Sequence, residues 1–183
     1  MYYRLTCNMD KYRNYYLKEE VKEGGELYFE TFDGRSHKDI YTPRNFILTA
    51  KREIKNPIAD MVFAYPICSE KAKNVISSIC DEGEVEFFPC TLEGCDETYY
   101  IFNVLGSEDC VDYEKSEFIK FPSSGKIMFF NHIEIGKEVN RHIFRIKDIA
   151  KSHYFVDERT KKILEAANLE GLEFDNSLFV KNK

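Results

Sequence analysis

The sequence predicts an α+β protein built mostly on antiparallel sheet, with two similar strand–helix–strand units and a less regular N-terminal part. Segments of strand-like composition outnumber segments with helical periodicity, and the two kinds do not alternate strictly along the chain. The two helical segments also share one scheme, in which a capping residue precedes the helix and a glycine follows it.

The first unit covers residues 61–89. Met61–Ala64 is a short apolar run that favours a strand, and Ser69 suits a helix N-cap because its hydroxyl accepts a hydrogen bond from a first-turn amide. Five apolar residues at helical spacing then define one face: Ala72, Val75, Ile76, Ile79 and Cys80. Gly83 ends the helix, and Val85–Phe88 has the composition of a strand.

The second unit covers residues 154–175 and repeats this scheme. Phe155-Val156 leads to Asp157, which is the expected N-cap, and Gly171 takes the place of Gly83. The helical face consists of Thr160, Ile163, Leu164 and Ala167. Leu172–Phe174 then resembles Val85–Phe87. Either an internal duplication or the chance recurrence of a common motif explains the likeness, and the sequence leaves both open.

Further strands are predicted outside the units from alternating, aromatic and β-branched residues. They are Tyr2–Cys7, Glu26–Phe32 with a turn at Asp33-Gly34, Tyr99–Val104, Lys126–Ile135 and His142–Ile146. The polar region around Pro43 reads as a loop with one short element at Phe46–Ala50. We expect residues 1–60 to form a strand-and-loop region that packs on a main domain of residues 61–183.

The charge of the chain limits its partners. A net charge of −6 and a pI near 5.4 argue against general binding to nucleic acids or anionic membranes. The N-terminus lacks the apolar run of a signal peptide, and no stretch is apolar over the length that spans a bilayer. We therefore expect a cytoplasmic protein with its six cysteines as thiols, and neither a nucleic-acid nor a membrane partner.

No recognisable catalytic, metal-binding or cofactor-binding pattern is found. The four histidines are scattered, and Cys90 and Cys95 form a C-x4-C pair that no second close pair completes. No glycine pattern for binding phosphate or dinucleotides is present. We expect no bound metal, whereas a Cys/His pair or an acid/base pair of side chains that meet only in space stays open.

The most unusual feature is an acidic stretch from Asp81 to Phe118, which holds twelve carboxylates and one base, Lys115. The stretch has two interpretations. In the first, acidic loops solvate one side of the domain, and Glu84 and Glu86 are the outward residues of a strand whose Val85 and Phe87 face inward. In the second, the stretch forms a docking surface for a basic partner, since complementary potentials select partners and speed encounter.

The order of motifs resembles a family of bacterial immunity proteins from polymorphic toxin systems, the myxobacterial-type family numbered eleven. The resemblance covers about Tyr2 to Phe174 and rests on four stretches. They are PICSEKAKNVI (66–76), VEFFP (85–89), YYIFNVLGSEDCVDYEKSEF (99–118) and HIFRIKD…YFVDERTKKILEAANLEGLEF (142–174). The third stretch is the most specific. The resemblance implies a cytoplasmic protein that binds and neutralises a cognate toxin by stoichiometric protein–protein interaction, with no catalysis and no cofactor.

The acidic stretch supplies the candidate toxin contacts. They are Glu84, Glu86, Glu108, Asp109, Asp112, Tyr113, Glu114 and Glu117. Many toxins that attack nucleic acids are basic, so a carboxylate surface suits the groove that is meant for phosphate. Asn103, Asp109, Asp112 and Ser116 have two open roles, toxin contact or turn capping, and turn capping is favoured for Asn103 and Ser116.

Two other classes of function remain open. A small enzyme would bring carboxylates and His132 or His142 together in a cleft, with several titratable groups in contact. A regulatory module would use its acidic face to bind a basic cellular protein other than a toxin. The oligomeric state does not follow from the sequence.

Overall fold

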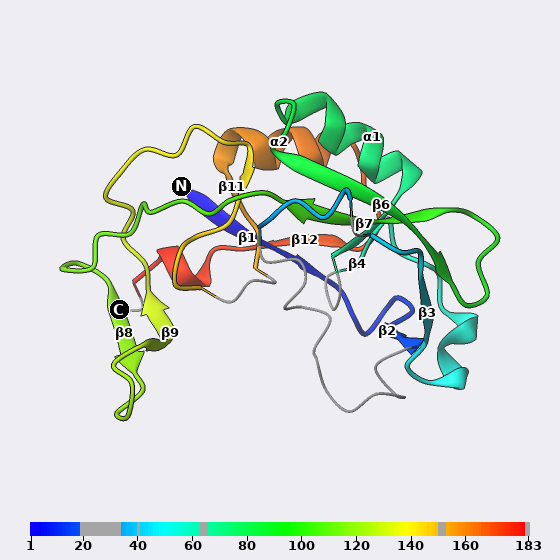
Figure 1. Ribbon diagram of the computed structural model, residues 1–183, viewed down its shortest axis with the longest axis horizontal. Coiled ribbons are helices and arrows are strands. Elements are labelled where there is room, and N and C mark those ends of the chain that lie inside the picture. The colour runs from blue at the N-terminus through cyan, green and yellow to red at the C-terminus, as the bar shows by residue number, and fades with distance from the viewer. Residues whose placement is uncertain (19–33, 40, 63–65, 150–152, 182–183) are drawn as a thin grey trace.

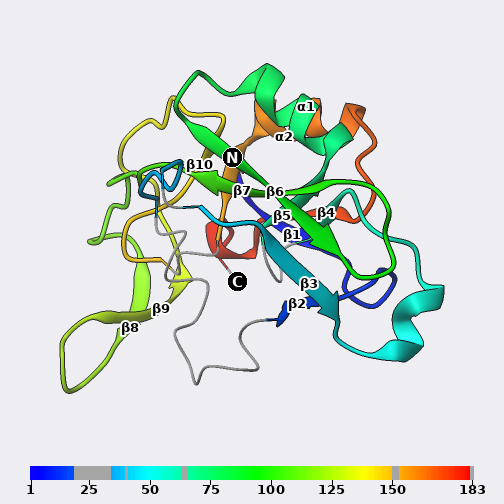
Figure 2. The same ribbon diagram turned by 45° about the vertical axis from the view of Figure 1, so that its right-hand side comes forward.

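The computed structural model describes residues 1–18, 34–39, 41–62, 66–149 and 153–181. Within these residues the chain forms two α-helices and twelve strands, which confirms the α+β class. The helices are α1 (Glu70–Ile79) and α2 (Glu158–Ala166), and they lie on the same side of the molecule (Figures 1 and 2). Short 3-10 helices occur at Lys51–Lys55 and Ser177–Phe179.

The larger sheet has six strands in the order β2-β3-β6-β7-β5-β4. Its strands are β2 (Tyr15–Leu17), β3 (Arg44–Leu48), β4 (Met61–Val62), β5 (Ile67–Ser69), β6 (Val85–Leu92) and β7 (Tyr99–Val104). All neighbouring strands are antiparallel except β3 and β6. The mostly antiparallel sheet therefore agrees with the prediction.

The second sheet has four strands in the order β10-β11-β1-β12, all antiparallel. Its strands are β1 (Tyr2–Cys7), β10 (Ile143–Phe144), β11 (Phe155–Asp157) and β12 (Leu172–Asp175). The two remaining strands, β8 (Glu117–Lys120) and β9 (Ile127–His132), pair only with each other in the described part of the chain. They form a ribbon that projects from the body (Figures 1 and 2).

The two helix-containing units share one topology, although the strand that leads into α1 is β5 and the predicted strand at Met61 is the edge strand β4. In the first, β5, α1 and β6 form a strand–helix–strand unit, and β7 lies between the two strands, antiparallel to both. In the second, β11, α2 and β12 form the unit, and β1 takes the place of β7. The edge strands β4 and β10 also correspond. The middle strand follows its unit in the first case and precedes it by most of the chain in the second, so the halves are related by a circular permutation.

Individual backbone contacts repeat between the halves. The N-cap residue of each helix pairs with a tyrosine of the middle strand, Ser69 with Tyr99 and Asp157 with Tyr2. In each middle strand one amide reaches the residue just before the unit: Phe102 N donates to Pro66 O at 2.8 Å, and Leu5 N to Tyr154 O at 2.9 Å. This repeated register supports a shared scaffold for the two units rather than a chance similarity of motif.

The capping chemistry explains where both helices begin. The Ser69 hydroxyl accepts from Ala72 N at 3.2 Å, and the Asp157 carboxylate accepts from Thr160 N at 2.7 Å. Each side chain thus satisfies an amide that the helix itself leaves unpaired. Both predicted caps are confirmed.

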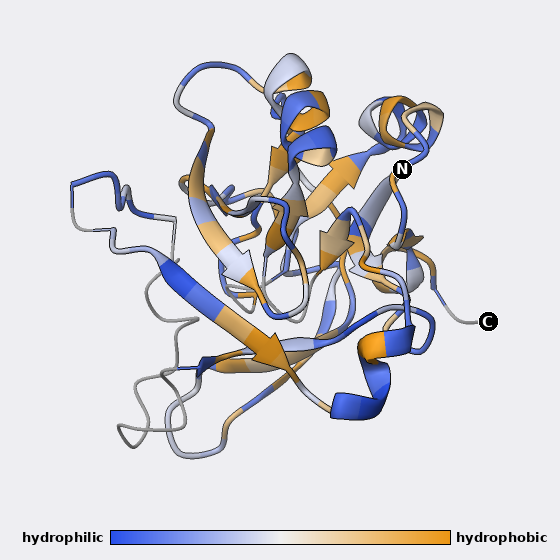
Figure 3. Cartoon of the chain, turned by 90° about the vertical axis from the view of Figure 1, so that its right-hand side faces the viewer, coloured by the Kyte–Doolittle hydropathy of each residue, from blue (hydrophilic) through white to orange (hydrophobic). Residues whose placement is uncertain are grey.

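One core is shared by the two units. The buried residues beneath both helices form a single cluster: Leu5, Met61, Cys68, Ala72, Ile76, Phe102, Val104, Ile143, Tyr154, Val156, Leu164 and Leu169. Figure 3 shows apolar residues (orange) along the strands and on part of each helix. A second cluster lies around β2, β3 and β6 and includes Tyr15, Phe46 and Phe88. β6 is therefore packed on both faces.

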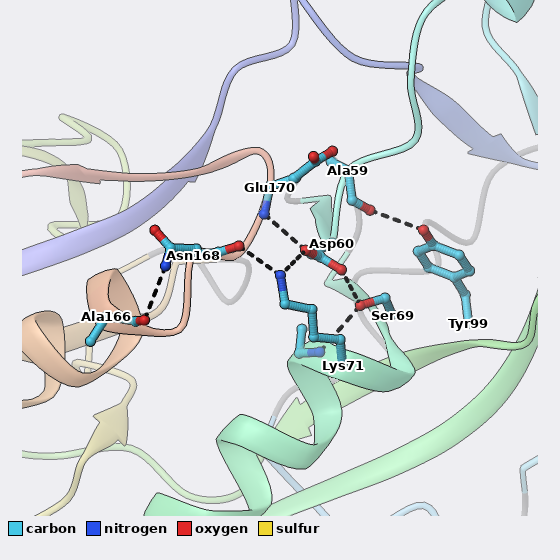
Figure 4. A network of polar contacts seen from close by, with 9 residues as sticks. Ala59, Asp60, Ser69, Lys71, Tyr99, Ala166, Asn168 and Glu170 are labelled. Atoms are coloured by element: carbon cyan, nitrogen blue, oxygen red, sulfur yellow. Dashed lines mark hydrogen bonds and ion pairs between the residues drawn. The ribbon is translucent and has the colours of Figure 1, made fainter.

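A polar network ties the two units together at Asp60 (Figure 4). The carboxylate of Asp60 accepts from the Ser69 hydroxyl at 2.5 Å and from Glu170 N, in the loop after α2, at 2.9 Å. The Lys71 ammonium lies 3.2 Å from the same carboxylate and also donates to Asn168 O at 2.7 Å. Asp60 thus fixes the start of α1 against the end of the second helix.

Several sequence predictions differ from the structure in detail. The predicted strand at 126–135 ends earlier, as β9, because the chain turns and Ile133 N donates to Leu178 O at 2.7 Å. The predicted strand at 142–146 is shortened to β10, and Ile163 of the expected apolar face is 36% exposed. The prediction of a strand at 26–32 lies outside the described residues, as do residues 63 and 64 of the strand that begins at Met61. The division of the chain at residue 60 stays a prediction.

Candidate interaction surfaces

The acidic stretch does not form one surface. The hairpin of β6 and β7 carries its acidic residues at two opposite ends, because Val85 pairs with Val104 at one end and Cys90 pairs with Tyr99 at the other. At about 3.3 Å per residue, the six paired positions of this hairpin span roughly 20 Å. Glu84 and Glu108 flank the first end, whereas Glu93, Asp96 and Glu97 lie in the loop at the other. A partner would therefore meet two separate acidic groups.

Glu84 and Glu108 are occupied by Arg141. The guanidinium donates from Nε to Glu84 Oε1 at 3.1 Å, and its Nη1 lies 3.6 Å from Glu108 Oε1. It also donates from Nη1 to Leu105 O at 2.5 Å and from Nη2 to Glu84 O at 3.1 Å. With so many internal contacts, Arg141 links the segment before β10 to the end of the β6–β7 hairpin. We therefore assign both carboxylates a structural role.

Glu86 is buried, so the prediction that it points outward is wrong. Glu86 is 3% exposed, and its carboxylate accepts hydrogen bonds from the Ser36 hydroxyl and from His37 N, the latter at 3.0 Å. The side-chain amide of Asn103, its partner in the β6–β7 register, donates to the same carboxylate at 3.3 Å and to Arg35 O at 2.7 Å. The cause is that β6 packs on both faces, which an alternating pattern alone does not reveal.

Asp112 caps a turn. Its Oδ1 accepts from Glu114 N at 3.1 Å and from Lys115 N at 3.3 Å, and its Oδ2 lies 2.8 Å from Lys115 Nζ. The hydrogen bond from Lys115 is the main cause that lowers the pKa of Asp112. The Ser116 hydroxyl donates to Asp112 O at 2.7 Å and accepts from Glu134 N at 2.9 Å. The turn-capping interpretation of Ser116 agrees with these contacts.

Tyr113 supports the base of the ribbon. Its hydroxyl donates to Asp148 at 2.8 Å, and its ring packs at 6.1 Å from that of Phe118 and 6.5 Å from that of Phe130. Burial, followed by the hydrogen bond to Asp148, raises the pKa of Tyr113 to about 12. The phenol therefore stays neutral at physiological pH and joins the ribbon to the body through a half-buried aromatic cluster.

The remaining predicted contacts are exposed. Asp109, Glu114 and Glu117 lie at the surface, and Asp109 forms an exposed ion pair of 3.4 Å with Lys147. Exposed pairs of this kind contribute little to stability, so this carboxylate is readily available to a partner. Of the eight predicted contacts, these three have carboxylates free of the internal networks of Arg141, Glu86 and the Asp112 turn.

The sequence reasoning missed the ribbon of β8 and β9 as a surface. Four of its large apolar side chains are exposed: Ile119 by 44%, Phe121 by 43%, Met128 by 43% and Phe129 by 46%. The printed sequence carries a signal for it, because the apolar runs FIKF and KIMFF flank a Pro-Ser-Ser-Gly turn. The prediction placed a strand at 126–135 and none at 117–120, so it did not identify this hairpin.

Comparison with known protein families gives a match over residues 14–177 of the 183 residues, to the immunity protein family Imm11. The chain belongs to the Imm11 immunity protein family. The match spans both strand–helix–strand units and the ribbon, and it confirms the resemblance seen in the sequence motifs. None of the curated proteins compared with this Imm11 protein matches it.

The candidate catalytic groups of the Imm11 chain are its histidines, acidic residues and cysteines. The two histidines of the enzyme hypothesis have different neighbours: His132 Nε2 lies 3.5 Å from Glu134 Oε2 without a hydrogen bond, and His142 Nδ1 lies 3.1 Å from Thr160 Oγ1. The His132 side chain is only 5% exposed, which keeps a substrate away from it. In the described ranges, no three histidine, cysteine or acidic side chains are grouped as metal ligands.

Burial keeps the thiols of Cys80 and Cys90 in the neutral form. None of the six cysteines forms a disulfide, and burial raises the pKa of both Cys80 and Cys90 to about 12. The thiolate, not the thiol, is the nucleophile, so these groups are poor candidates for covalent catalysis. None of the helices in the described part of the chain is long and apolar enough to cross a membrane.

Proposed function

We propose that this protein binds a cognate toxin in the cytoplasm and neutralises it by forming a stoichiometric complex, without catalysis and without a cofactor. Membership in the Imm11 immunity family over residues 14–177 is the observation that carries the proposal. The different neighbours of His132 and His142 and the raised pKa values of Cys80 and Cys90 support a role in binding rather than in chemistry.

The rigid scaffold suits such a role. Both units are joined by the Asp60 network and share one buried core, so surface groups between them are held in fixed positions. Pre-organised surfaces bind with a smaller loss of conformational entropy. Asp109, Glu114 and Glu117 are the acidic residues that we retain as candidate contacts for a basic region of the toxin.

Co-expression with the toxin domain encoded beside the gene tests the proposal. Cells that make both proteins should survive, and the two should co-purify as a complex of fixed stoichiometry. Cell death without a complex would refute the immunity function. A complex that forms while the toxin stays active would refute neutralisation and favour a regulatory partner.

The acidic contacts are tested separately with Glu114→Lys and Asp109→Lys. Asp112 is unsuitable for this test because its reversal would also break the turn that it caps. If Asp109 and Glu114 face a basic region of the toxin, the variant that combines both substitutions binds the toxin more weakly, and its affinity depends less on salt concentration. Lys38→Glu, at an exposed position elsewhere on the chain, is the matched control for a change of charge.

A further inference from the structure

We propose that the β8–β9 ribbon is the element that enters the toxin, and that its occupant is a toxin cleft with apolar walls and carboxylates at its rim. The inference rests on the proposed function and names the surface and the chemistry of the partner. The ribbon stands clear of the body in two views of the molecule (Figures 1 and 2).

One face of the ribbon is apolar and uncovered. Ile119 and Phe129 are paired in the register of the two strands, and by strand alternation they lie on the face opposite Phe118 and Phe130. With the neighbouring Phe121 and Met128, each between 43% and 46% exposed, they expose roughly 300–400 Å² of apolar surface. Patches of this size on soluble proteins are often functional.

Beyond its base, where Glu117 and His132 lie, the ribbon has a charge opposite to that of the chain. Between Phe118 and Phe130 the only ionisable side chains are Lys120 and Lys126, whereas the whole chain has a net charge of −6. Both lysines line a hollow on the face that looks toward Tyr113 and Asp148. Within the described residues, neither ammonium lies within ion-pair distance of a carboxylate. A partner that compensates the charge of these two lysines must therefore present acidic groups.

The ribbon is pre-organised at both ends. At its base, Phe118 and Phe130 pack at 5.5 Å from each other and against Tyr113. At its tip, Phe121 N donates to Lys126 O at 2.8 Å, and Gly125 N donates back to Phe121 O at 2.9 Å. A projection held in shape before binding loses little conformational entropy when it enters a cleft.

The exposed area favours a cleft over a second copy of this chain. A symmetric contact through the apolar face alone would bury roughly 600–800 Å² in total, below the 1,200 Å² or more of stable interfaces. A cleft that closes on both faces would cover the apolar residues and the two lysines together. An acidic, apolar-walled cleft is therefore the occupant that fits both observations.

The test measures the affinity of the full-length protein for its catalytically inactivated toxin by calorimetry. One variant combines Ile119→Ser with Phe129→Ser, and a second combines Lys120→Glu with Lys126→Glu. Ile54→Ser is the matched control, because Ile54 is 52% exposed in the 3-10 helix Lys51–Lys55, on a different part of the fold. Urea unfolding of each variant checks that the fold is kept.

We expect the apolar variant to raise Kd about 100-fold and the lysine variant to raise it about 10-fold at low salt, with the control within about twofold. The lysine variant should also lose most of the salt dependence. Unchanged affinity in both ribbon variants would overturn the inference while the proposed function stands, as would ribbon-dependent dimers of the protein alone. Weakening by Glu114→Lys only would place the interface on the acidic group instead. Failure of the wild-type protein to bind would reject the proposed function itself.

Discussion

Replacement of Gly171 by alanine should destabilise the protein much more than the same change at Gly83. The two glycines follow the two helices at equivalent places, and both have left-handed backbones, with φ of +83° and +85°. They differ in their surroundings. A Cβ on Gly171 would lie 2.4 Å from the Cβ of Ala59 and 3.2 Å from Met61 O, whereas no atom of the described residues lies within 4 Å of a Cβ on Gly83.

The magnitudes follow from these contacts. A left-handed alanine costs about 1 kcal/mol, and the lower entropy of the unfolded chain returns about 0.5 kcal/mol of it. We therefore expect Gly83→Ala to lower the free energy of unfolding by about 0.5 kcal/mol. At Gly171 the overpacking adds about 1–3 kcal/mol, because Ala59 precedes Asp60, whose hydrogen bonds prevent the loop from moving away.

Urea unfolding, followed by circular dichroism, measures both variants, since a change of midpoint at constant slope reports stability. Ala59→Gly combined with Gly171→Ala removes the opposing Cβ and should recover most of the added loss. Equal destabilisation by Gly83→Ala and Gly171→Ala would refute the packing argument. Failure of the double variant to recover would show that backbone conformation, not the contact with Ala59, sets the cost.

Three further predictions concern the polar networks. Asp60→Ala should lower the free energy of unfolding, measured with urea, by about 2 kcal/mol, because partly buried donors of both units lose their acceptor. A loss under about 0.5 kcal/mol would show that Asp60 does not hold the two units together. Arg141→Ala should lower the free energy of unfolding by about 2 kcal/mol, whereas Lys147→Ala, which removes an exposed ion pair, should lower it by about 0.3 kcal/mol. Equal losses would be inconsistent with the structural role assigned to Arg141. Because the pKa of Asp112 is lowered from its ordinary value of 3.8, its contact with Lys115 stabilises the fold above that pH. This stabilisation is lost as the pH falls below that value. The urea midpoint of Asp112→Asn should therefore decrease less steeply with falling pH than the midpoint of the wild type.

Local chemistry made the two helices predictable. Ser69 and Asp157 satisfy amides within their own first turns, so a short stretch of sequence holds all the information for the start of each helix. The strand at Tyr2–Cys7 was likewise recognisable from its composition, and the structure places it at the same residues. The position of that strand between β11 and β12 was not recognisable, because its partners lie at the other end of the chain.

The candidate surface was harder to predict than the fold. Glu86 has an outward-facing pattern, but Ser36, His37 and Asn103 bury it, and the first two lie far away in the sequence. The density of carboxylates predicts a docking surface in the acidic stretch, but two of these carboxylates, Glu84 and Glu108, contact Arg141 of the same chain. The exposed residues of the ribbon resemble core residues in composition, and only the three-dimensional arrangement shows that nothing in the described chain covers them.

The pairing of β1 with β11 and β12 sets the order in which the protein can be completed during translation. The first unit and its middle strand β7 are contiguous, so their strands can pair as soon as residues 61–104 have emerged from the ribosome, although the shared core is still incomplete. β1 cannot pair with β11 and β12 until residues 155–175 have been made, roughly 10–30 s after β1 itself at ordinary elongation rates. During that interval a nascent strand with two unpaired edges is exposed to chaperones, and no complete second sheet exists. If the proposed function holds, a chain presents its complete scaffold to a toxin only after residues 155–175 have been made.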